Sequence, residues 1–373
     1  MANYVQSSID ALFAGMVVPQ PIYNADMSLI LVPEGIILTE ARIEQLKKYN
    51  ESTAKICVSA ATEKLLQQRR DELSSQPLTK ELEDEIGYTE IKVDAFELLE
   101  RISHEESVSM TELTTVSEEL SHTVESTEPA IIVDLVSALA SADEYLQRHC
   151  VNVGMMNGLF GKWLGMPKEN VDTLILVGLL HDCGKASIPN KILSAPRALT
   201  LVEFEVVKTH PEFSGSLMMD LPETVRLSAR GHHEKINGAG YPDGLSGDSI
   251  PFMARITAVS DIYDAMVSRR SYKNPNSPFR IMSIVAGLRG SELDGALVDV
   301  FISNMSREMI GKQVLLSDGR LGIVLSIDPE KLEFPAVEVG GKALNTNAGL
   351  SCASLYYSEA SPLTGEAPVP AAG

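Results

Sequence analysis

Cysteine is scarce in this chain, which has four cysteines among 373 residues. They stand apart at Cys57, Cys150, Cys183 and Cys352, and no two have the CxxC spacing that is typical of thiolate zinc and redox sites. We therefore expect no thiolate metal centre. In a reducing compartment these residues are predicted to be small, buried apolar side chains.

Long apolar runs are also lacking. No run reaches the ~18 apolar residues that a membrane-spanning helix requires, and the N-terminus lacks the basic-then-apolar pattern of a secretory signal. The sequence therefore predicts a soluble, cytoplasmic protein without a membrane span.

Basic residues are outnumbered, with 31 Lys and Arg against 51 Asp and Glu, and the formal net charge is −20. Residues 71–128 contain 17 acidic and 3 basic residues, whereas residues 129–290 contain 16 of each. An acidic chain excludes broad binding to large nucleic acids, because that requires a basic face. The balanced segment remains compatible with a small anionic substrate.

Histidine, by contrast, is concentrated, since five of the seven histidines fall between residues 149 and 233. Neutral imidazole and carboxylate groups are ligands that borderline-hard divalent metals prefer. Seven such groups are too many for one ion and suit two ions that share a bridging carboxylate. The pattern predicts a metal-dependent hydrolase with the candidate ligands His149, His181, Asp182, His210, His232, His233 and Asp261.

The first part of the chain, residues 1–60, is predicted to be a small β-rich N-terminal module. Apolar runs at 16–18, 29–32 and 56–58 are strand-like, with turn residues between them. A short helix is expected at about residues 39–49, where a threonine can cap its start.

The fold class expected for the whole chain is mainly α, with β-rich modules at both ends. Residues 61–128 read as an acidic, partly helical connector, either a dimerising helical segment or a solvated linker. Residues 129–306 contain helix-length apolar segments and are predicted to be all-helical. Residues 307–358 read as a β-rich extension, and residues 359–373 as a disordered tail.

The candidate ligands lie within longer motifs. Residues 181–185 read HDxGK, His210 is followed by proline, residues 232–242 read HHExxNGxGYP, and residues 260–265 read SDIYDA. In this order and spacing the motifs resemble the HD-GYP family, the cyclic di-GMP phosphodiesterases of the HD superfamily. The resemblance covers about 150 residues and implies that residues 129–306 form an HD-type helical bundle.

The resemblance also assigns roles. It makes Asp182 the bridging carboxylate, closes the first metal site with Asp261, and gives His210, His232 and His233 to the second. Lys185 is implied in catalysis together with Asp182. The residues implied in binding substrate are Lys185, Arg270 and Lys273 at the phosphates, and Gly240 and Tyr241 in the GYP loop.

One position departs from part of the family. Some members carry a glutamate four residues before the first histidine, which allows a third ion, and here that position is Tyr145. Glu144 is one residue away, about 100° around a helix. We therefore expect two ions in this chain.

The expected chemistry is hydrolysis of cyclic di-GMP to 5′-pGpG, and onward to GMP, by a hydroxide bridging two metal ions. The resemblance implies iron, with manganese as the alternative. Two other functions stay open: a receptor that binds cyclic di-GMP without turnover, and an HD phosphohydrolase of another nucleotide. Expected partners are the dinucleotide, a second copy of the chain, and signalling proteins that contact the GYP loop.

Overall fold

The computed structural model describes most of the chain after residue 87 and, before it, four short strands. It describes residues 88–355 apart from gaps at 105–107, 139–144, 194, 196, 219–220, 268–276, 319 and 348. The chain divides into two compact units. One comprises residues 77–276, 281–309 and 360–373, and the other comprises residues 1–76, 277–280 and 310–359.

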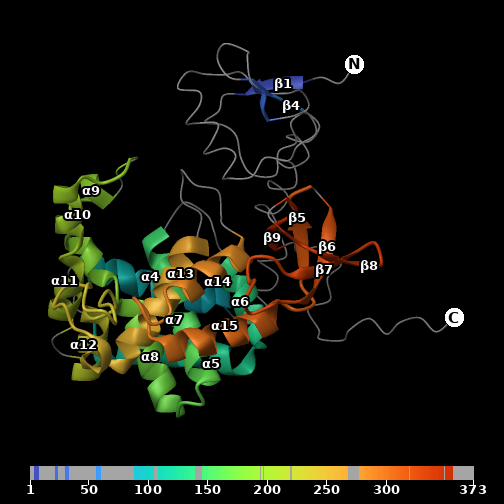
Figure 1. Ribbon diagram of the computed structural model, residues 1–373. Coiled ribbons are helices and arrows are strands. Elements are labelled where there is room, and N and C mark those ends of the chain that lie inside the picture. Colours follow the sequence, from blue (N-terminus) through green and yellow to red (C-terminus); the bar gives the residue numbers. More distant parts are fainter. Residues whose placement is uncertain are drawn as a thin grey trace. The chain divides into compact units, whose positions relative to one another are not determined.

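Two long helices form the centre of the helical unit (Figure 1). They are α7 (Tyr145–Trp163) and α8 (Lys168–Leu180), which lie side by side. A Cβ atom added to Gly178 would lie 2.7 Å from the Cα of Gly154, so two glycines allow this close approach. The C-terminal half of α8 is buried nearly all round, as the apolar run Leu174–Leu180 predicted.

Helices α4 (Tyr88–Ser103) and α5 (Met110–Ser126) pack in the same unit. A capping box between Ser109 and Glu112 starts α5, and Leu113, Val116 and Leu120 are buried on the side of α5 that meets α7 and α8. Part of the segment predicted to be a connector is therefore core, and a boundary at residue 128 would cut through one compact unit. The other predicted domain boundaries stay predictions.

Four further helices complete the bundle. They are α6 (Pro129–Ala138), α13 (Phe252–Val267), α14 (Pro278–Gly287) and α15 (Gly295–Met309). Phe160 of α7 stacks on Phe301 of α15 with ring centroids 5.8 Å apart, and Tyr263 of α13 meets the same ring at 5.3 Å. This aromatic core fixes α13 against α7.

The chain also contains short helices. In chain order they are η2 (Cys183–Ser187), α9 (Asn190–Leu193), α10 (Leu201–Val207), α11 (His210–Leu217), α12 (Glu223–Arg230) and η3 (Gly247–Ser249). Four of them, α9 to α12, lie at one side of the bundle (Figure 1). Helix α11 packs on η2, and α12 packs on both α8 and α11. These contacts bring the starts and ends of several helices to the C-terminal end of α8.

In the first 60 residues, β1 (Tyr4–Ser7) pairs antiparallel with β4 (Ile56–Ser59), and β2 (Ile22–Tyr23) pairs with β3 (Ile30–Val32). The strands predicted near residues 29–32 and 56–58 are therefore confirmed. The strand predicted at 16–18 and the helix predicted at 39–49 lie outside the described residues.

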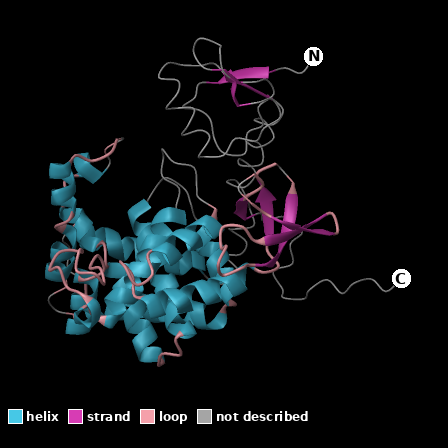
Figure 2. Ribbon diagram, in the orientation of Figure 1, coloured by secondary structure: helices cyan, strands magenta, loops and turns pink. Residues whose placement is uncertain are grey.

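A five-stranded antiparallel sheet follows the helices in the sequence. Its order is β8-β7-β6-β5-β9, formed by β5 (Gln313–Leu316), β6 (Leu321–Ser326), β7 (Ala336–Val339), β8 (Lys342–Asn345) and β9 (Cys352–Leu355). Figure 2 shows the resulting distribution, mainly helical with strands near both ends of the chain, which confirms the predicted fold class. The predicted tail lies outside the described residues.

None of the helices in the described part of the chain is long and apolar enough to cross a membrane.

Candidate metal centre

The seven predicted ligands come from five places in the chain and meet in one buried cluster. His149 lies on α7, His181 and Asp182 at the end of α8, His210 at the start of α11, the histidine pair after α12, and Asp261 on α13. Five of the residues are at most 2 % exposed and Asp261 is 8 % exposed. The side chain of His233 is 26 % exposed, so this ligand faces the opening of the site.

Asp182 lies at the centre of the cluster. Its Oδ2 atom is 3.4 Å from Nε2 of His149 and 3.5 Å from Nε2 of His181. Its Oδ1 atom is 3.1 Å from Nε2 of His210 and 3.8 Å from Nε2 of His232. One carboxylate thus presents each oxygen to a different pair of histidines, as a carboxylate that bridges two ions does.

The group around Oδ2 is called the first cluster and consists of His149, His181, Asp182 and Asp261. Oδ1 of Asp261 is 3.1 Å from Nε2 of His149 and 3.9 Å from Nε2 of His181. The two histidine Nε2 atoms lie 3.3 Å apart. Two imidazoles and two carboxylates therefore surround one point.

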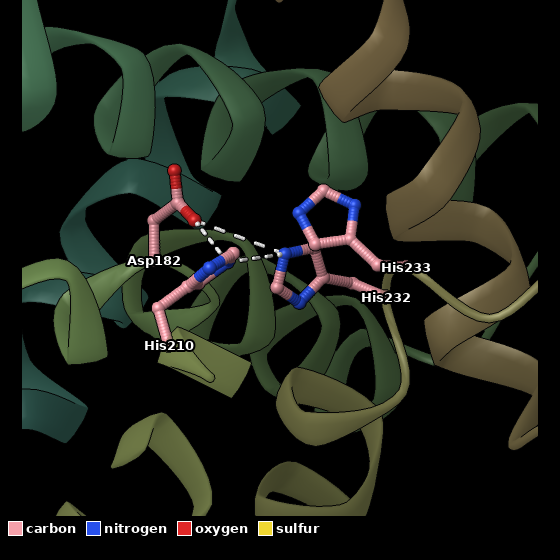
Figure 3. A group of neighbouring side chains, drawn as sticks. All are labelled: Asp182, His210, His232 and His233. Atoms are coloured by element: carbon pink, nitrogen blue, oxygen red, sulfur yellow. Dashed lines mark hydrogen bonds and ion pairs between the residues drawn. The ribbon is translucent and has the colours of Figure 1, made fainter. Parts of the chain in front are cut away.

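The group around Oδ1 is called the second cluster and consists of Asp182, His210, His232 and His233 (Figure 3). Each of these residues offers one ligand atom, and the four atoms lie within 4.8 Å of one another. Nε2 of His210 is 3.5 Å from Nε2 of His232, and the rings of His232 and His233 are 4.0 Å apart. This cluster holds three imidazoles and the shared carboxylate.

Backbone carbonyls determine which ring nitrogen points inward. The Nδ1 atoms of His181, His210 and His232 lie 2.6, 2.7 and 2.6 Å from the carbonyl oxygens of the third residue before each. Nδ1 therefore carries the proton and Nε2 presents a lone pair to the cluster. The Nε2 atoms of His149 and His181 lie 3.3 Å apart, and those of His210 and His232 lie 3.5 Å apart, so one cation could be bound by both members of each pair.

The buried Oδ1 atom of Asp182 accepts no hydrogen bond. A buried carboxylate oxygen without a donor is costly unless a cation compensates its charge. Together with the inward lone pairs, this atom shows that the residues present fit divalent metal ions.

Burial controls the protonation of these groups. It lowers the pKa of His181 and His232, and that of His233 to about 3, so these ligands are neutral near pH 7. For His149 the burial is outweighed by hydrogen bonds to Asp182, Asp261 and Asp264, which raise its pKa. The pKa of Asp182 is well below its usual value because Lys185 and His181 outweigh its burial.

Lys185 and the GYP loop border the cluster. Nζ of Lys185 contacts Oδ2 of Asp182, and the lysine side chain is 22 % exposed. The Tyr241 ring packs on His233 with centroids 4.8 Å apart. A Cβ atom on Gly240 would lie 2.6 Å from the carbonyl oxygen of His233, so only glycine fits this close approach.

Three residues were missed by reasoning from the sequence. Buried Glu234 accepts hydrogen bonds from the backbone of Asp243 and Leu245, at 2.7 and 2.9 Å, and so ties the GYP loop together. Nζ of Lys208 lies 5.7 Å from the Tyr241 ring centroid. Buried Asp264 accepts a hydrogen bond from Nδ1 of His149 at 2.7 Å. Glu234 and Asp264 stand within the quoted motifs, which is the only signal the sequence offers for them.

Two predicted substrate-binding residues, Arg270 and Lys273, lie outside the described residues. Tyr145 is the first residue of α7, one turn before His149. The prediction of two ions, drawn from that position, stays a prediction.

Part of the chain is similar to known proteins. Residues 134–297 match the HD domain family model. The chain is 35 % identical over 214 residues to a cyclic di-GMP phosphodiesterase of Pseudomonas aeruginosa, covering 57 % of this chain and 51 % of the relative. It is 33 % identical over 199 residues to a cyclic di-GMP phosphodiesterase response regulator of Xanthomonas campestris, covering 51 % and 53 %.

A 3′3′-cGAMP-specific phosphodiesterase of Vibrio cholerae is also similar, at 29 % identity over 196 residues, covering 52 % of this chain and 37 % of the relative. The chain therefore spans about half the length of the first two relatives and less of the third.

Proposed function

Residues 134–297 match the HD domain family model, and from this premise we propose that the chain is a metal-dependent phosphodiesterase that hydrolyses cyclic di-GMP to 5′-pGpG and then to GMP. The observation that carries the proposal is the division of the Asp182 carboxylate between two histidine clusters. The similarity to two cyclic di-GMP phosphodiesterases supports the choice of substrate.

Two divalent ions bound in the clusters would supply a water deprotonated near neutral pH and would neutralise charge on the phosphate. The shared carboxylate of Asp182 would set their spacing. His149, His181 and Asp261 would hold one ion, and the second cluster would hold the other. Imidazole and carboxylate ligands suit iron, and manganese as the alternative.

The nearby cysteines fit this assignment because neither belongs to the groups of side chains that could hold a metal ion in the described part of the chain. Burial raises the pKa of Cys183 to about 12 and raises that of Cys150 as well, so both thiols keep their protons.

Lys185 would donate a charge-assisted hydrogen bond to a non-bridging phosphate oxygen. Its side chain lies against Asp182 and remains partly exposed, so it borders both the clusters and the opening. The contact with the Asp182 carboxylate would hold the ammonium group where charge would develop on the reacting phosphate.

The GYP loop would bind the nucleotide. The face of Tyr241 offers a surface for a guanine base, and Gly240 lets the backbone approach closely. Lys208, next to the Tyr241 ring, carries a positive charge at the same edge. Its carboxylate partner, Glu205, is 67 % exposed and 2.8 Å away, and an exposed pair of this kind is weak enough to yield to a phosphate. Arg270 and Lys273 would bind the second phosphate of the dinucleotide.

Two kinds of protein partner are also proposed. A second copy of the chain would form a homodimer, and signalling proteins would contact the GYP loop.

A second substrate, 3′3′-cGAMP, is favoured by the similarity to a phosphodiesterase specific for it. The two dinucleotides differ in one base, so the chemistry at the metal centre would be the same. Contacts to the bases would determine which dinucleotide is hydrolysed faster.

The test is turnover by protein loaded with Fe²⁺ without oxygen, or with Mn²⁺, with each dinucleotide in turn and the products separated by chromatography. We expect pGpG and GMP from cyclic di-GMP and slower cleavage of 3′3′-cGAMP. Asp182→Asn removes the bridging charge with little change in shape and should abolish turnover. Asp299→Asn, at an exposed pair with Arg289, makes the same change of carboxylate to amide; it is the matched control and should leave turnover unchanged.

Binding of cyclic di-GMP by metal-loaded wild type without any product would contradict the proposal and favour a receptor. Equal turnover by wild type and Asp182→Asn would refute the role of the clusters.

A further inference from the structure

The inner histidines are not all held in the same way. Backbone carbonyls of Gly178, Val207 and Ala229 accept the Nδ1 protons of His181, His210 and His232. A side-chain carboxylate, that of Asp264, accepts the proton of His149 instead. His149 belongs to the first cluster, so the two clusters differ in what stands behind their ligands.

Asp264 is fully buried and both of its oxygens are used. Oδ2 lies 2.7 Å from Nδ1 of His149, and Oδ1 accepts a hydrogen bond from Nδ2 of Asn152 at 2.8 Å. Asn152 follows His149 by one turn of α7, and Asp264 follows Asp261 by one turn of α13. Two adjacent helices thus face each other through two successive pairs of side chains, His149 with Asp261 and Asn152 with Asp264.

This arrangement fixes His149 in two respects. The hydrogen bond to Asp264 keeps a proton on Nδ1, so an ion that displaces the proton from Nε2 would be bound by that atom. The amide of Asn152 fixes the carboxylate, and the carboxylate fixes the plane of the imidazole ring. A carboxylate behind a ligating histidine also raises the basicity of the ring and hence its strength as a ligand.

The charges around the two clusters differ accordingly. The first cluster contains the carboxylate of Asp261 in addition to that of Asp182, and the carboxylate of Asp264 contacts the outer nitrogen of its ligand His149. The second cluster contains three imidazoles and the shared Asp182, and Asp261 approaches it only through Oδ2, 3.8 Å from Nδ1 of His233. At equal distance a negatively charged carboxylate attracts a divalent cation more strongly than an uncharged ligand does. The low effective dielectric of a buried site strengthens that attraction.

We propose that Asp264 is a positioning residue for His149 and that it makes the first cluster the tighter of two unequal metal sites, so that the ions bind in order, first cluster before second. The inference rests on the proposed metal centre. Its consequence is that formation of the two-ion centre is governed by the second, weaker cluster.

The experiment is a titration of metal-free, full-length protein with Mn²⁺, followed by calorimetry and by electron paramagnetic resonance. Wild type should bind in two steps. The signal of an isolated ion should grow through the first equivalent and decline through the second, as the two ions couple magnetically. Uptake by two equivalent sites would overturn the proposal without variants being needed.

Asp264→Asn keeps the shape of the side chain and removes its charge. Its first binding step should weaken roughly 10- to 100-fold, the range found when such outer partners are removed, and its second step should weaken much less. Wild-type affinity in both steps, or equal weakening of both, would overturn the proposal.

The matched control is Thr257→Val. Thr257 is buried on the same helix α13 and makes hydrogen bonds to Met253 and Asn157, away from the clusters. It should lose stability and leave both binding steps unchanged. If Asp264→Asn behaves like wild type while wild type takes up two ions, this inference fails and the proposed function stands. If wild type takes up no ion, both fail.

Discussion

Substitution of Gly178 by alanine tests whether the spacing of α7 and α8 sets the geometry of the first cluster. An added Cβ would lie 2.7 Å from both Cα and N of Gly154, and 2.8 Å from Nδ2 of Asn157. Carbon atoms pack best about 3.5–4.0 Å apart, so the helices must separate by about 1 Å. The obstacle is backbone and cannot rotate away.

The expected loss of stability is about 1–3 kcal/mol for overpacking, offset by up to about 1 kcal/mol because alanine favours a helix interior over glycine. The larger effect falls on the metal site. His149 is on α7 and His181 at the end of α8, and their Nε2 atoms are 3.3 Å apart. Widening that gap by about 1 Å should weaken binding of the first ion strongly, because ligand geometry tolerates about 0.5 Å of error.

The assays are urea unfolding of metal-free protein and metal content by mass spectrometry after dialysis. Gly287→Ala, at the end of α14 where an added Cβ would meet nothing within 4 Å, is the matched control and should change neither. A Gly178→Ala protein that keeps wild-type stability and wild-type metal content would refute the argument that this close approach positions the ligands.

Three further predictions concern the border of the site. Glu234→Gln leaves one backbone N–H of the GYP loop facing an amide N–H, at a cost of about 1.5–3 kcal/mol, so hydrogen exchange in residues 234–245 should speed up; unchanged exchange would contradict the role of Glu234. Lys208→Gln should raise KM about tenfold and leave kcat unchanged, because its charge would bind ground and transition states alike; a fall in kcat alone would show another role. Burial lowers the pKa of His233 to about 3, so in metal-free protein the unfolded chain takes up a proton near pH 6.5 that the folded chain does not, and this residue's contribution to stability falls as the pH drops. Between about pH 7.5 and about pH 5 the unfolding free energy of wild type should fall by up to about 2 kcal/mol more than that of His233→Gln, and parallel pH profiles would refute it.

The gathering of the candidate ligands could be predicted because these residues stand in local motifs. His181 with Asp182 and His232 with His233 are adjacent in sequence, and the structure places the predicted bridging residue, Asp182, between two groups of histidines. The role of Asp264 could not be predicted, because it depends on α7 facing α13, and its partner His149 is 115 residues away.

The choice between the two interpretations of residues 61–128 could not be made from the sequence, for a related reason. The acidic composition is compatible with a helical segment and with a solvated linker, and in the described part of this segment Leu113, Val116 and Leu120 are buried on α5. Helical spacing indicated a helix there, but the apolar partner of these side chains lies on α7 and α8, which the local sequence does not reveal. The average composition of a long segment does not reveal a narrow buried face on one of its helices.

The packing of α5 also has a practical consequence. The family match begins at residue 134, yet helix α5, which ends at Ser126, packs its buried apolar face against α7 and α8. Lys162 of α7 donates a hydrogen bond to the carbonyl oxygen of Val124, 2.8 Å away. A fragment expressed from residue 134 would expose to water the surface of α7 and α8 that α5 covers and would aggregate, whereas one beginning before Tyr88 would keep it covered. The segment that matches the family model, residues 134–297, is therefore shorter than the segment that must be expressed for the metal centre to fold.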